Sequence, residues 1–465
     1  MRAMCLLASL AAAALFAACD VWGTSSQLLP GDGATADGEP DGGGDNSHDA
    51  GHDGGFDGGF DGGPDTNPDG GDMTGCALTQ TSFADLALSL GTSQPSALAA
   101  GEFGGSGTTP DLAVGFPLEK KITAYVDLSL DSSVSYETSF TSDFSESPQA
   151  LAVIEIPGST GEDDLVVLTI PSQSGQPLHV IALENSGSSS FNTVDTLTSG
   201  QISQPNVTYN LGVGKFSGDS YPDIIATCSN RCSQAGIFPW DQDLRSFADI
   251  VSIAPGNPVD ALTVADLNHD GQDDVVVGDS QMSMNTYLRY GIANGGAGVF
   301  GWNTIAEIGS SNWVREIAVA DFDGDGVADV AAVVVVSNEF QLWSYRGTSS
   351  GGGFTGFSSS HATIGLGTGF SLVRLRKGDF NRDGKPDLAV LTATSPSPSS
   401  VHLLINRYFG SGIVFQDTLT VPVCSGDTSG KDLVVHDFDG NGADDLAVAC
   451  VGTENTINFL RNDCQ

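Results

Sequence analysis

The sequence predicts an all-β fold, a seven-bladed β-propeller of four-stranded blades, and three observations support this prediction. An Asp-rich stretch recurs seven times, with starts at residues 102, 155, 215, 266, 321, 379 and 437. Each copy lies between short apolar runs of strand character, and we find no stretch with helical spacing. The steps between copies are 51 to 60 residues, which indicates a repeat architecture with one blade per copy.

One repeat shows how a blade is built. Residues 247–253 alternate like a half-buried edge strand, and 261–265 form an apolar strand that leads into the Asp-rich stretch. Residues 275–278 and 285–290 supply two further strands. The Asp-rich stretch therefore joins the first and second strands of its blade.

The two ends of the repeat array predict how the ring closes. Residues 82–86 match 246–250, which form the outermost strand of a preceding blade, although the first copy has no preceding blade. The last blade stops after a third strand at 456–460. We therefore expect an N-terminal strand at 82–90 to pair with residues around 456–461, so that no edge stays open.

The Asp-rich stretches predict cation loops. In the copy that starts at Asp321, carboxylates fall at positions 1, 3, 5 and 9, and a glycine at position 6 permits a sharp turn. Calcium takes six to eight oxygen ligands from such loops, including a backbone carbonyl at position 7, whereas magnesium requires a stricter octahedron. We expect about four structural calcium ions. The predicted ligands are Asp266, Asn268, Asp270, Gln272, Asp274, Asp321, Asp323, Asp325, Val327, Asp329, Asp379, Asn381, Asp383, Lys385, Asp387, Asp437, Asp439, Asn441, Ala443 and Asp445.

The three earlier copies depart from this pattern, and we expect them to be metal-free. Lys215 replaces the first carboxylate in the third copy, and its ammonium is expected where a cation would lie. The copies at 102–111 and 155–164 are one residue longer and poor in carboxylates.

The pattern at Asp379–Val390 resembles the FG-GAP and VCBS repeats of integrin α-subunit propellers and related bacterial surface proteins. The resemblance covers about residues 77–463. It implies a seven-bladed propeller with calcium in the loops between first and second strands, and ligands often bound on the opposite face. It implies no single activity, because a fold hosts many functions.

The N-terminal region predicts export and anchoring. Residues 1–19 have one early positive charge, an apolar core and small residues before Cys19, which resembles a lipoprotein signal whose cysteine is lipidated. Residues 20–75 form an Asp/Gly-rich linker with thirteen acidic residues and no Lys or Arg, so we expect disorder. Residues 76–465 form the propeller. We expect a bacterial cell-envelope location, at the outer membrane or cell surface rather than the inner membrane.

Cysteine positions predict three disulfides in an exported domain. Cys76 and Cys464 lie at the two ends that should meet, and Cys228 and Cys232 are close enough in sequence to form a small loop. Cys424 and Cys450 are both expected on the face opposite the cation loops. A metal or redox role for Cys228 and Cys232 remains an alternative.

The composition and the motifs of the sequence limit the classes of function that we expect. The net charge is −41 with only 17 Lys and Arg, which argues against nucleic acid as a partner. We find no nucleophile elbow, phosphate loop or isolated general-acid pair. We expect a monomeric, non-catalytic module that binds an unidentified protein or glycan. The alternatives are a polysaccharide lyase on a calcium propeller and a purely structural envelope component. Trp240, Trp302, Trp313 and Trp343 could bind sugars, although core packing is expected for Trp343.

Overall fold

The computed structural model describes residues 22–25 and 76–464, apart from short gaps. These gaps are 77, 80–82, 106–108, 160, 174, 188–189, 203–207, 229–234, 254–257, 280–284, 297, 395–398, 407–411 and 426–427. The described residues form strands and turns but no helix, so none of their segments is a helix long and apolar enough to span a membrane.

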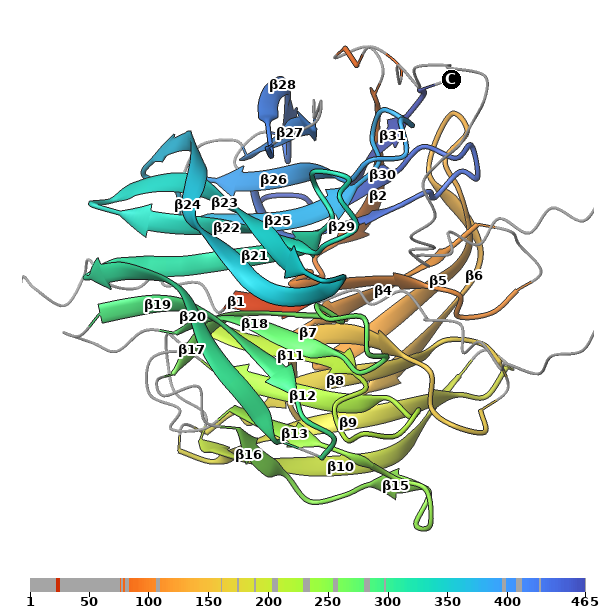
Figure 1. The fold of residues 1–465 in the computed structure, drawn as a ribbon. Helices are drawn as coiled ribbons and strands as arrows, with labels where there is room; N and C mark the ends of the chain where they lie inside the picture. The colour runs from red at the N-terminus through yellow and green to blue at the C-terminus, as the bar shows by residue number, and fades with distance from the viewer. Residues whose placement is uncertain are drawn as a thin grey trace, which may run out of the picture.

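The strands form seven antiparallel blades, which confirms the predicted propeller (Figure 1). Blade 1 has β3 (Ala97–Gly101), β4 (Asp111–Phe116), β5 (Lys121–Ser129) and β6 (Ser135–Asp143). Blade 2 has β7 (Ser147–Ile154), β8 (Asp164–Ile170), β9 (Pro177–Asn185) and β10 (Phe191–Ile202). Blade 3 has β11 (Thr208–Gly214), β12 (Asp223–Cys228), β13 (Ala235–Phe238) and β16 (Val251–Ile253), with the pair β14 (Trp240–Asp241) and β15 (Ser246–Phe247) between the last two.

The remaining four blades follow the same order. Blade 4 has β17 (Val259–Ala265), β18 (Asp274–Asp279), β19 (Asn285–Ala293) and β20 (Phe300–Ser310). Blade 5 has β21 (Trp313–Ala320), β22 (Asp329–Val336), β23 (Glu339–Ser350) and β24 (Gly353–Thr368). Blade 6 has β25 (Leu372–Gly378), β26 (Asp387–Ala393), β27 (Ser399–Asn406) and β28 (Phe415–Val423). Blade 7 has β29 (Ser429–His436), β30 (Asp445–Val451), β31 (Asn455–Asn462) and β2 (Phe83–Gly91).

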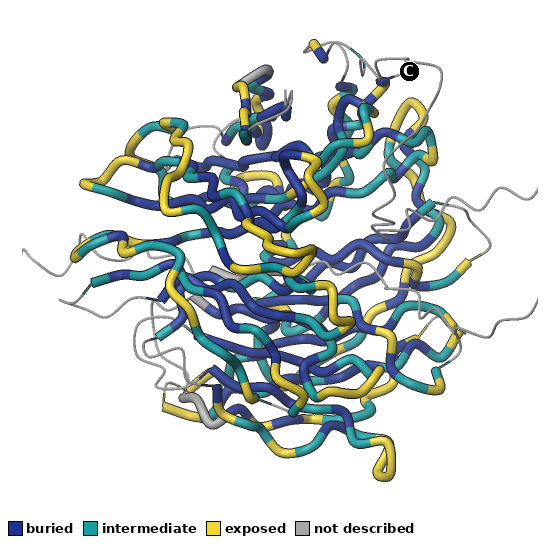
Figure 2. Tube along the Cα trace, in the orientation of Figure 1, coloured by how far each residue is buried: buried dark blue, intermediate teal, exposed yellow. Residues whose placement is uncertain are grey.

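The blades form a closed ring around an axis. The first strand of each blade contacts the first strand of the next, and β29 of blade 7 returns to β3 of blade 1. The second strands are apolar and buried, as Val330–Val335 in β22 illustrates, because adjacent blades cover both of their faces (Figure 2). The core therefore lies between the blades, and the connecting loops lie at the two ends of the ring.

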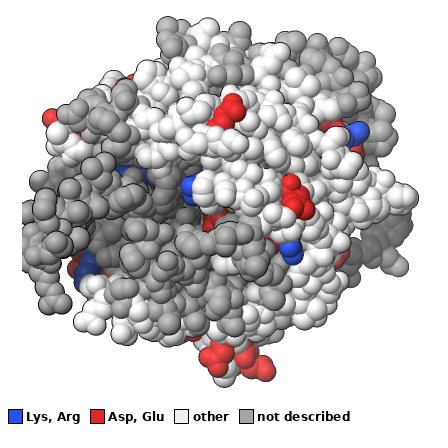
Figure 3. Space-filling model, turned by 90° about the vertical axis from the view of Figure 1, so that its left-hand side faces the viewer, with Lys and Arg blue, Asp and Glu red and all other residues white. Residues whose placement is uncertain are grey.

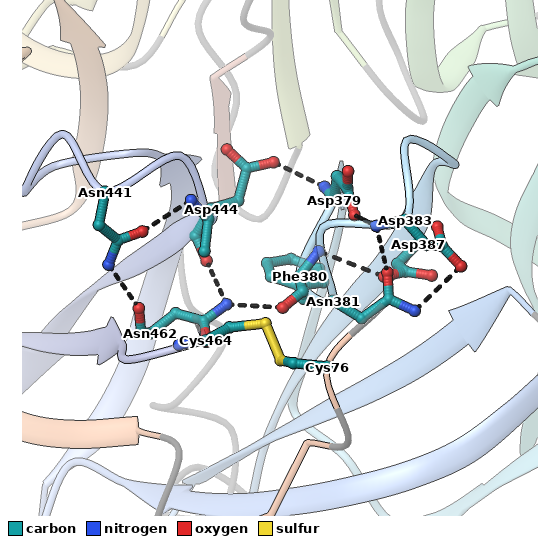
Figure 4. Close-up of a disulfide and its surroundings, with 11 residues drawn as sticks. Cys76, Asp379, Phe380, Asn381, Asp383, Asp387, Asn441, Asp444, Asn462 and Cys464 are labelled. Atoms are coloured by element: carbon teal, nitrogen blue, oxygen red, sulfur yellow. Dashed lines mark hydrogen bonds between the residues drawn. A yellow bond between two sulfur atoms is a disulfide. The ribbon is translucent and has the colours of Figure 1, made fainter. Parts of the chain in front are cut away.

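The N-terminal strand β2 completes blade 7, as predicted. Phe83 pairs with Asn462 and Ser89 with Thr456, in the antiparallel register expected from the repeat pattern. Cys76 and Cys464 are joined by a disulfide with a Cα–Cα distance of 5.9 Å (Figure 4). The Cys76 N–H also donates to the carbonyl of Asn381 at 2.8 Å, so the N-terminal end is held by blade 6 as well.

Two other cysteine predictions have different outcomes. Cys424 and Cys450 are bonded in the structure, with a Cα–Cα distance of 5.3 Å. The pairing of Cys228 with Cys232 lies outside the described residues, since Cys232 is in a gap.

A short strand departs from the linker prediction. Residues Trp22–Ser25 form β1, which pairs in parallel with β11 from Trp22↔Thr208 to Ser25↔Leu211. β1 also contacts the inner strands β3, β7 and β29, so it lies at the centre of the ring. The signal peptide, Cys19 and the rest of 20–75 lie outside the described residues.

A buried ion network ties three blades together near the axis. Arg374 and Arg376 of β25 each contact Glu316 of β21 and Asp432 of β29, all at 3.3 Å. The other oxygen of Asp432 accepts the Leu98 N–H of blade 1 at 3.0 Å. These arginines therefore balance buried carboxylates, which would be costly without a partner.

Candidate metal loops

The four complete Asp-rich loops share one hydrogen-bond skeleton. In the copy from Asp321 to Asp329, the first aspartate accepts the N–H groups of Asp325 at 3.1 Å and Gly326 at 2.7 Å. The equivalent bonds to Asp266, Asp379 and Asp437 are 2.7–3.2 Å long. Gly326 has a φ of 79°, a conformation that only glycine adopts readily, so position 6 needs this residue.

The side chain at position 5 also forms a hydrogen bond within its own loop. The side chain at position 5 accepts the N–H of position 7, as Asp325 does from Val327 at 2.9 Å. The same bond forms at Asp270, Asp383 and Asn441. The skeleton therefore fixes the backbone while leaving carboxylate lone pairs directed into each loop.

Two of the four loops gather three carboxylates closely. Oxygens of Asp321, Asp323 and Asp325 lie within 4.8 Å of one another, and so do those of Asp437, Asp439 and Asp445. Both oxygens of Asp323 are buried, and one of them contacts the Arg346 Nε. An all-oxygen donor set with a buried carboxylate of this kind fits a hard cation such as calcium. The backbone carbonyl at position 7, in Gln272, Val327, Lys385 and Ala443, remains a predicted ligand.

The loops that start at Asp266 and Asp379 have an asparagine at position 3. The Asn268 amide donates to Asp270 at 3.0 Å, and the Asn381 amide donates to Asp383 at 3.1 Å. Their donor sets therefore carry less charge than that of the Asp321 loop, although all candidate ligand positions lie in the same arrangement.

The aspartate at position 9 has a structural role that the ligand prediction did not include. It is fully buried in all seven blades, including the three with weak loops, and one oxygen accepts the N–H of position 2 or its equivalent. The other oxygen accepts an N–H from the third strand or, in blade 3, from Trp240 two residues beyond that strand. For Asp223 these donors are Phe216 and Trp240, both at 2.8 Å. The equivalent residues are Asp111, Asp164, Asp274, Asp329, Asp387 and Asp445.

Burial makes these seven carboxyls unusually basic. Desolvation raises the pKa of Asp164 and Asp223 to about 6, and that of Asp387 and Asp445 to about 8, although the backbone N–H donors lower it. The pKa of Asp111, Asp274 and Asp329 rises to about 7 for the same reason. Without a bound cation, these carboxyls therefore keep their protons to a higher pH than an exposed aspartate does.

We predict that stability falls as pH rises from about 5 to 8 when a chelator is present. In the unfolded chain these carboxyls are ionised above about pH 4, whereas the folded chain keeps protons on them up to pH 6–8. The unfolded state then binds fewer protons, so the free energy of unfolding decreases with pH across this window. Urea unfolding at several pH values in about 1 M salt, which screens surface repulsion, measures this slope. A free energy that is constant or rises would contradict it.

A second carboxylate joins neighbouring blades at three interfaces. Asp163, Asp273 and Asp444 occupy position 8, and each accepts the N–H of position 1 in the preceding blade, at 2.8, 2.8 and 2.6 Å. The partners are Glu102, Lys215 and Asp379, whose carbonyls accept the N–H of the same three aspartates at 2.7–3.4 Å. We call each reciprocal pair an aspartate latch; Figure 4 shows the one between Asp444 and Asp379.

Each aspartate latch faces a glycine. Gly101, Gly214 and Gly378 come immediately before Glu102, Lys215 and Asp379, and in the four other repeats this place holds Ile154, Ala265, Ala320 or His436. A Cβ on Gly378 would lie 2.9 Å from the Asp444 carboxylate, and one on Gly101 would lie 2.7 Å from that of Asp163. The glycine and the downstream aspartate thus form one paired signal, which the sequence contained but which we did not recognise.

Asparagines add a further interblade contact. The side-chain amides of Asn185, Asn406 and Asn462 donate to the carbonyls of Phe103, Phe322 and Phe380 in the preceding blade, at 2.6–2.8 Å. Asn462 lies two residues from Cys464, so this contact and the disulfide support the same part of the seam (Figure 4).

We predict that Gly378→Ala destabilises the fold by about 1–3 kcal/mol, as overpacking does. The new Cβ would meet Val435 at 2.7 Å and both Asp444 and Phe380 at 2.9 Å, so the latch between blades 6 and 7 must shift. Gly353→Ala is the matched control, because its Cβ would have its nearest neighbour at 3.9 Å. Denaturant unfolding of both variants measures the difference, and equal stabilities would argue against the latch.

The weak loops and the tryptophans complete the comparison with sequence. Neither group of three clustered carboxylates lies in the weak loops. The Lys215 backbone forms a latch, and the placement of its ammonium in the loop stays a prediction.

The four tryptophans considered as sugar-binding residues lie in different surroundings. Trp240 is buried against Phe247, and Trp343 stacks on His361 at 4.1 Å. Only Trp313 is among the exposed large apolar residues, so these four tryptophans do not make a shared sugar-binding surface.

Fold and loops together define a seven-bladed β-propeller in which four blades have a complete aspartate-rich loop after the first strand. Residues 266–332 and 379–448 match the family model of the FG-GAP-like repeat. These two segments therefore carry FG-GAP-like repeats, in agreement with the resemblance noted in the sequence, and they lie in a seven-bladed propeller. No curated protein matches the chain.

Solved structures support the fold alone. A crystal structure of BBS1N in complex with ARL6DN matches with a TM-score of 0.51 and 11% identity over 83% of this chain and 98% of that one. The Chaetomium thermophilum Polycomb Repressive Complex 2 bound to GSK126 matches with a TM-score of 0.51 and 11% identity, covering 81% and 97% of the two chains. At this identity the likeness carries no function.

Proposed function

We propose that this chain is a calcium-stabilised, envelope-anchored and non-catalytic module that binds a protein or glycan. The observation that carries the proposal is the division of the ring into two ends. The Asp-rich loops and their hydrogen bonds occupy one end, where a cation would serve stability. The opposite end is then available for a ligand, and an FG-GAP-like propeller is compatible with a binding module.

The described residues at the opposite end carry few charged groups. Figure 3 views the side on which β19 begins, away from the Asp-rich loops, and the described residues there show only small, separated charged groups. Trp313 lies at this end because β21 starts there, and its side chain is among the exposed apolar ones. The Arg315 guanidinium lies 5.5 Å from its ring centroid. An exposed indole beside a cation suits a glycan or a protein contact.

Five of the described arginines are held by carboxylates, which favours binding over catalysis. Arg289, Arg346, Arg374, Arg376 and Arg461 all pair with carboxylates. A polysaccharide lyase needs cationic groups and a base that face a substrate, so committed arginines support the non-catalytic proposal. A purely structural envelope component would share the same loops but would bind no ligand at the opposite end.

Glycan-array and pull-down measurements with the full chain test this function. We expect capture of one ligand class in calcium, weaker capture by Trp313→Ala, and unchanged capture by Tyr136→Ala, an exposed aromatic control on β6. Lyase activity on any array polysaccharide would favour the enzyme. Absence of any bound ligand would favour the structural component.

The anchor has its own test. Replacing Cys19 with serine should release the protein from membranes, because the acyl chains supply the binding energy. Labelling with a palmitate analogue should mark the wild type and not the Cys19→Ser variant. An unlabelled wild type would leave the propeller without the proposed anchor.

A further inference from the structure

An arginine lies across the loop with the most carboxylates. Arg346 is on β23, and its guanidinium contacts Asp323 through Nε and Asp325 through Nη2, the latter at 2.7 Å. The next residue, Gly347, donates its N–H to Asp329 at 2.7 Å, which fixes the position of the arginine over the loop. The Arg346 side chain remains 42% exposed, so it can leave the loop without breaking the core.

A second arginine occupies the equivalent place in blade 7. Arg461 precedes Asn462, whose N–H donates to Asp445 just as Gly347 does to Asp329. Arg461 Nε lies 3.8 Å from Asp439 and 2.8 Å from Asp463, so it is shared between two carboxylates. Its hold on the loop is therefore looser than that of Arg346.

An arginine at this place on the third strand occurs only in the two complete loops that have an aspartate at position 3. Asp323 and Asp439 are the aspartates at position 3, and both have this arginine. In the loops with Asn268 or Asn381 at position 3, the equivalent third-strand residues are Ile292 and Ile405, which precede the N–H donors Ala293 and Asn406. An aspartate at position 3 and an arginine on the third strand therefore occur together.

We propose that Arg346, and more weakly Arg461, is an internal counter-ion that competes with calcium for the carboxylate at position 3. The inference rests on the calcium binding in the proposed function and adds its regulation. On this proposal the four loops form two groups. The Asp321 and Asp437 loops are guarded, which means that an arginine contacts the carboxylate at position 3, and the Asp266 and Asp379 loops have no such arginine on the third strand. A cation enters a guarded loop only when the guanidinium leaves, because a unit positive charge and a divalent ion a few ångströms apart repel each other even in water.

Calorimetric titration of the full chain with calcium chloride tests the competition. Arg346→Gln should bind one calcium ion about tenfold or more tightly than the wild type, and Arg461→Gln should show a smaller gain. Arg245→Gln, which removes an exposed charge elsewhere, is the control and should match the wild type. Unchanged or weaker binding by Arg346→Gln overturns the inference while leaving the proposed function intact. No calcium binding by any variant overturns both.

The melting temperature provides a second test, which does not depend on measuring the calcium affinity. Without calcium, Arg346→Gln leaves Asp321, Asp323 and Asp325 uncompensated, so its melting temperature in chelator should fall below that of the wild type. In saturating calcium the same variant should recover the wild-type value or exceed it. A deficit that persists equally in both conditions would mean that Arg346 is only a packing residue.

Discussion

Deleting residues 76–91 is expected to abolish the soluble, cooperatively folded monomer. β2 supplies the fourth strand of blade 7 and pairs with β31 over its whole length. Leu86, Leu88 and Leu90 also pack against the core between blades 7 and 1. Removal would expose an apolar edge strand, which is a template for aggregation. Size-exclusion chromatography with circular dichroism would measure the loss.

Removing the Cys76–Cys464 disulfide tests how much of the ring closure depends on the covalent bond and how much on strand pairing. Replacing Cys76 and Cys464 with serine should lower stability by up to about 6 kcal/mol on the chain-entropy model, because the bridge spans 388 residues, but should keep the fold. The β2–β31 pairing and the Asn462 contact to blade 6 remain in that variant. A deletion variant that melts like the wild type would refute closure by β2. Peptide mapping that pairs Cys464 with Cys424 or Cys450 would refute the lock.

Asp223→Ala is expected to destabilise the ring by about 3–5 kcal/mol, equally in calcium and in chelator. Its carboxylate accepts the buried N–H groups of Phe216 and Trp240 and the Ser217 hydroxyl at 3.2 Å. Each buried donor left without an acceptor costs about 1–3 kcal/mol. We expect the weak loop of the third blade to bind no cation, so the loss should not depend on calcium.

Asp219→Ala is the control for that prediction. Asp219 belongs to the same loop but is exposed, and it accepts the Tyr221 N–H at 3.0 Å. We expect a change within about 0.5–1 kcal/mol. Chemical unfolding with and without calcium distinguishes the two variants. If Asp223→Ala costs no more than Asp219→Ala, the position-9 aspartate does not organise the blade.

The fold could be predicted from the sequence because each blade of a propeller repeats the same pattern of strands and loop residues. One period of about 55 residues, seven copies and two mismatched ends were enough to predict blade number and closure. The strand β1 was not predicted, because an Asp/Gly-rich segment has no alternating pattern and its pairing with β11 is purely tertiary.

The site was predicted less completely than the fold. A cation ligand and a buried backbone acceptor are both aspartates, so the sequence alone did not separate the role of Asp223 from that of Asp321. Arg346 was missed because it lies on the third strand, 23 residues beyond Asp323. The aspartate latches were missed because Asp444 and Gly378 form a signal only when the two blades are placed side by side.

Calorimetric melting of the full chain with and without calcium tests the central claim most directly. We expect affinities on the order of 10⁻⁴ to 10⁻³ M, and each ion should add about 2.7 kcal/mol at a hundredfold excess over its Kd. The melting temperature should therefore rise with calcium, rise less with magnesium, and fall in chelator with the strand content unchanged. A melting temperature that is the same in chelator and in calcium would contradict the claim that these loops are calcium sites that stabilise the propeller.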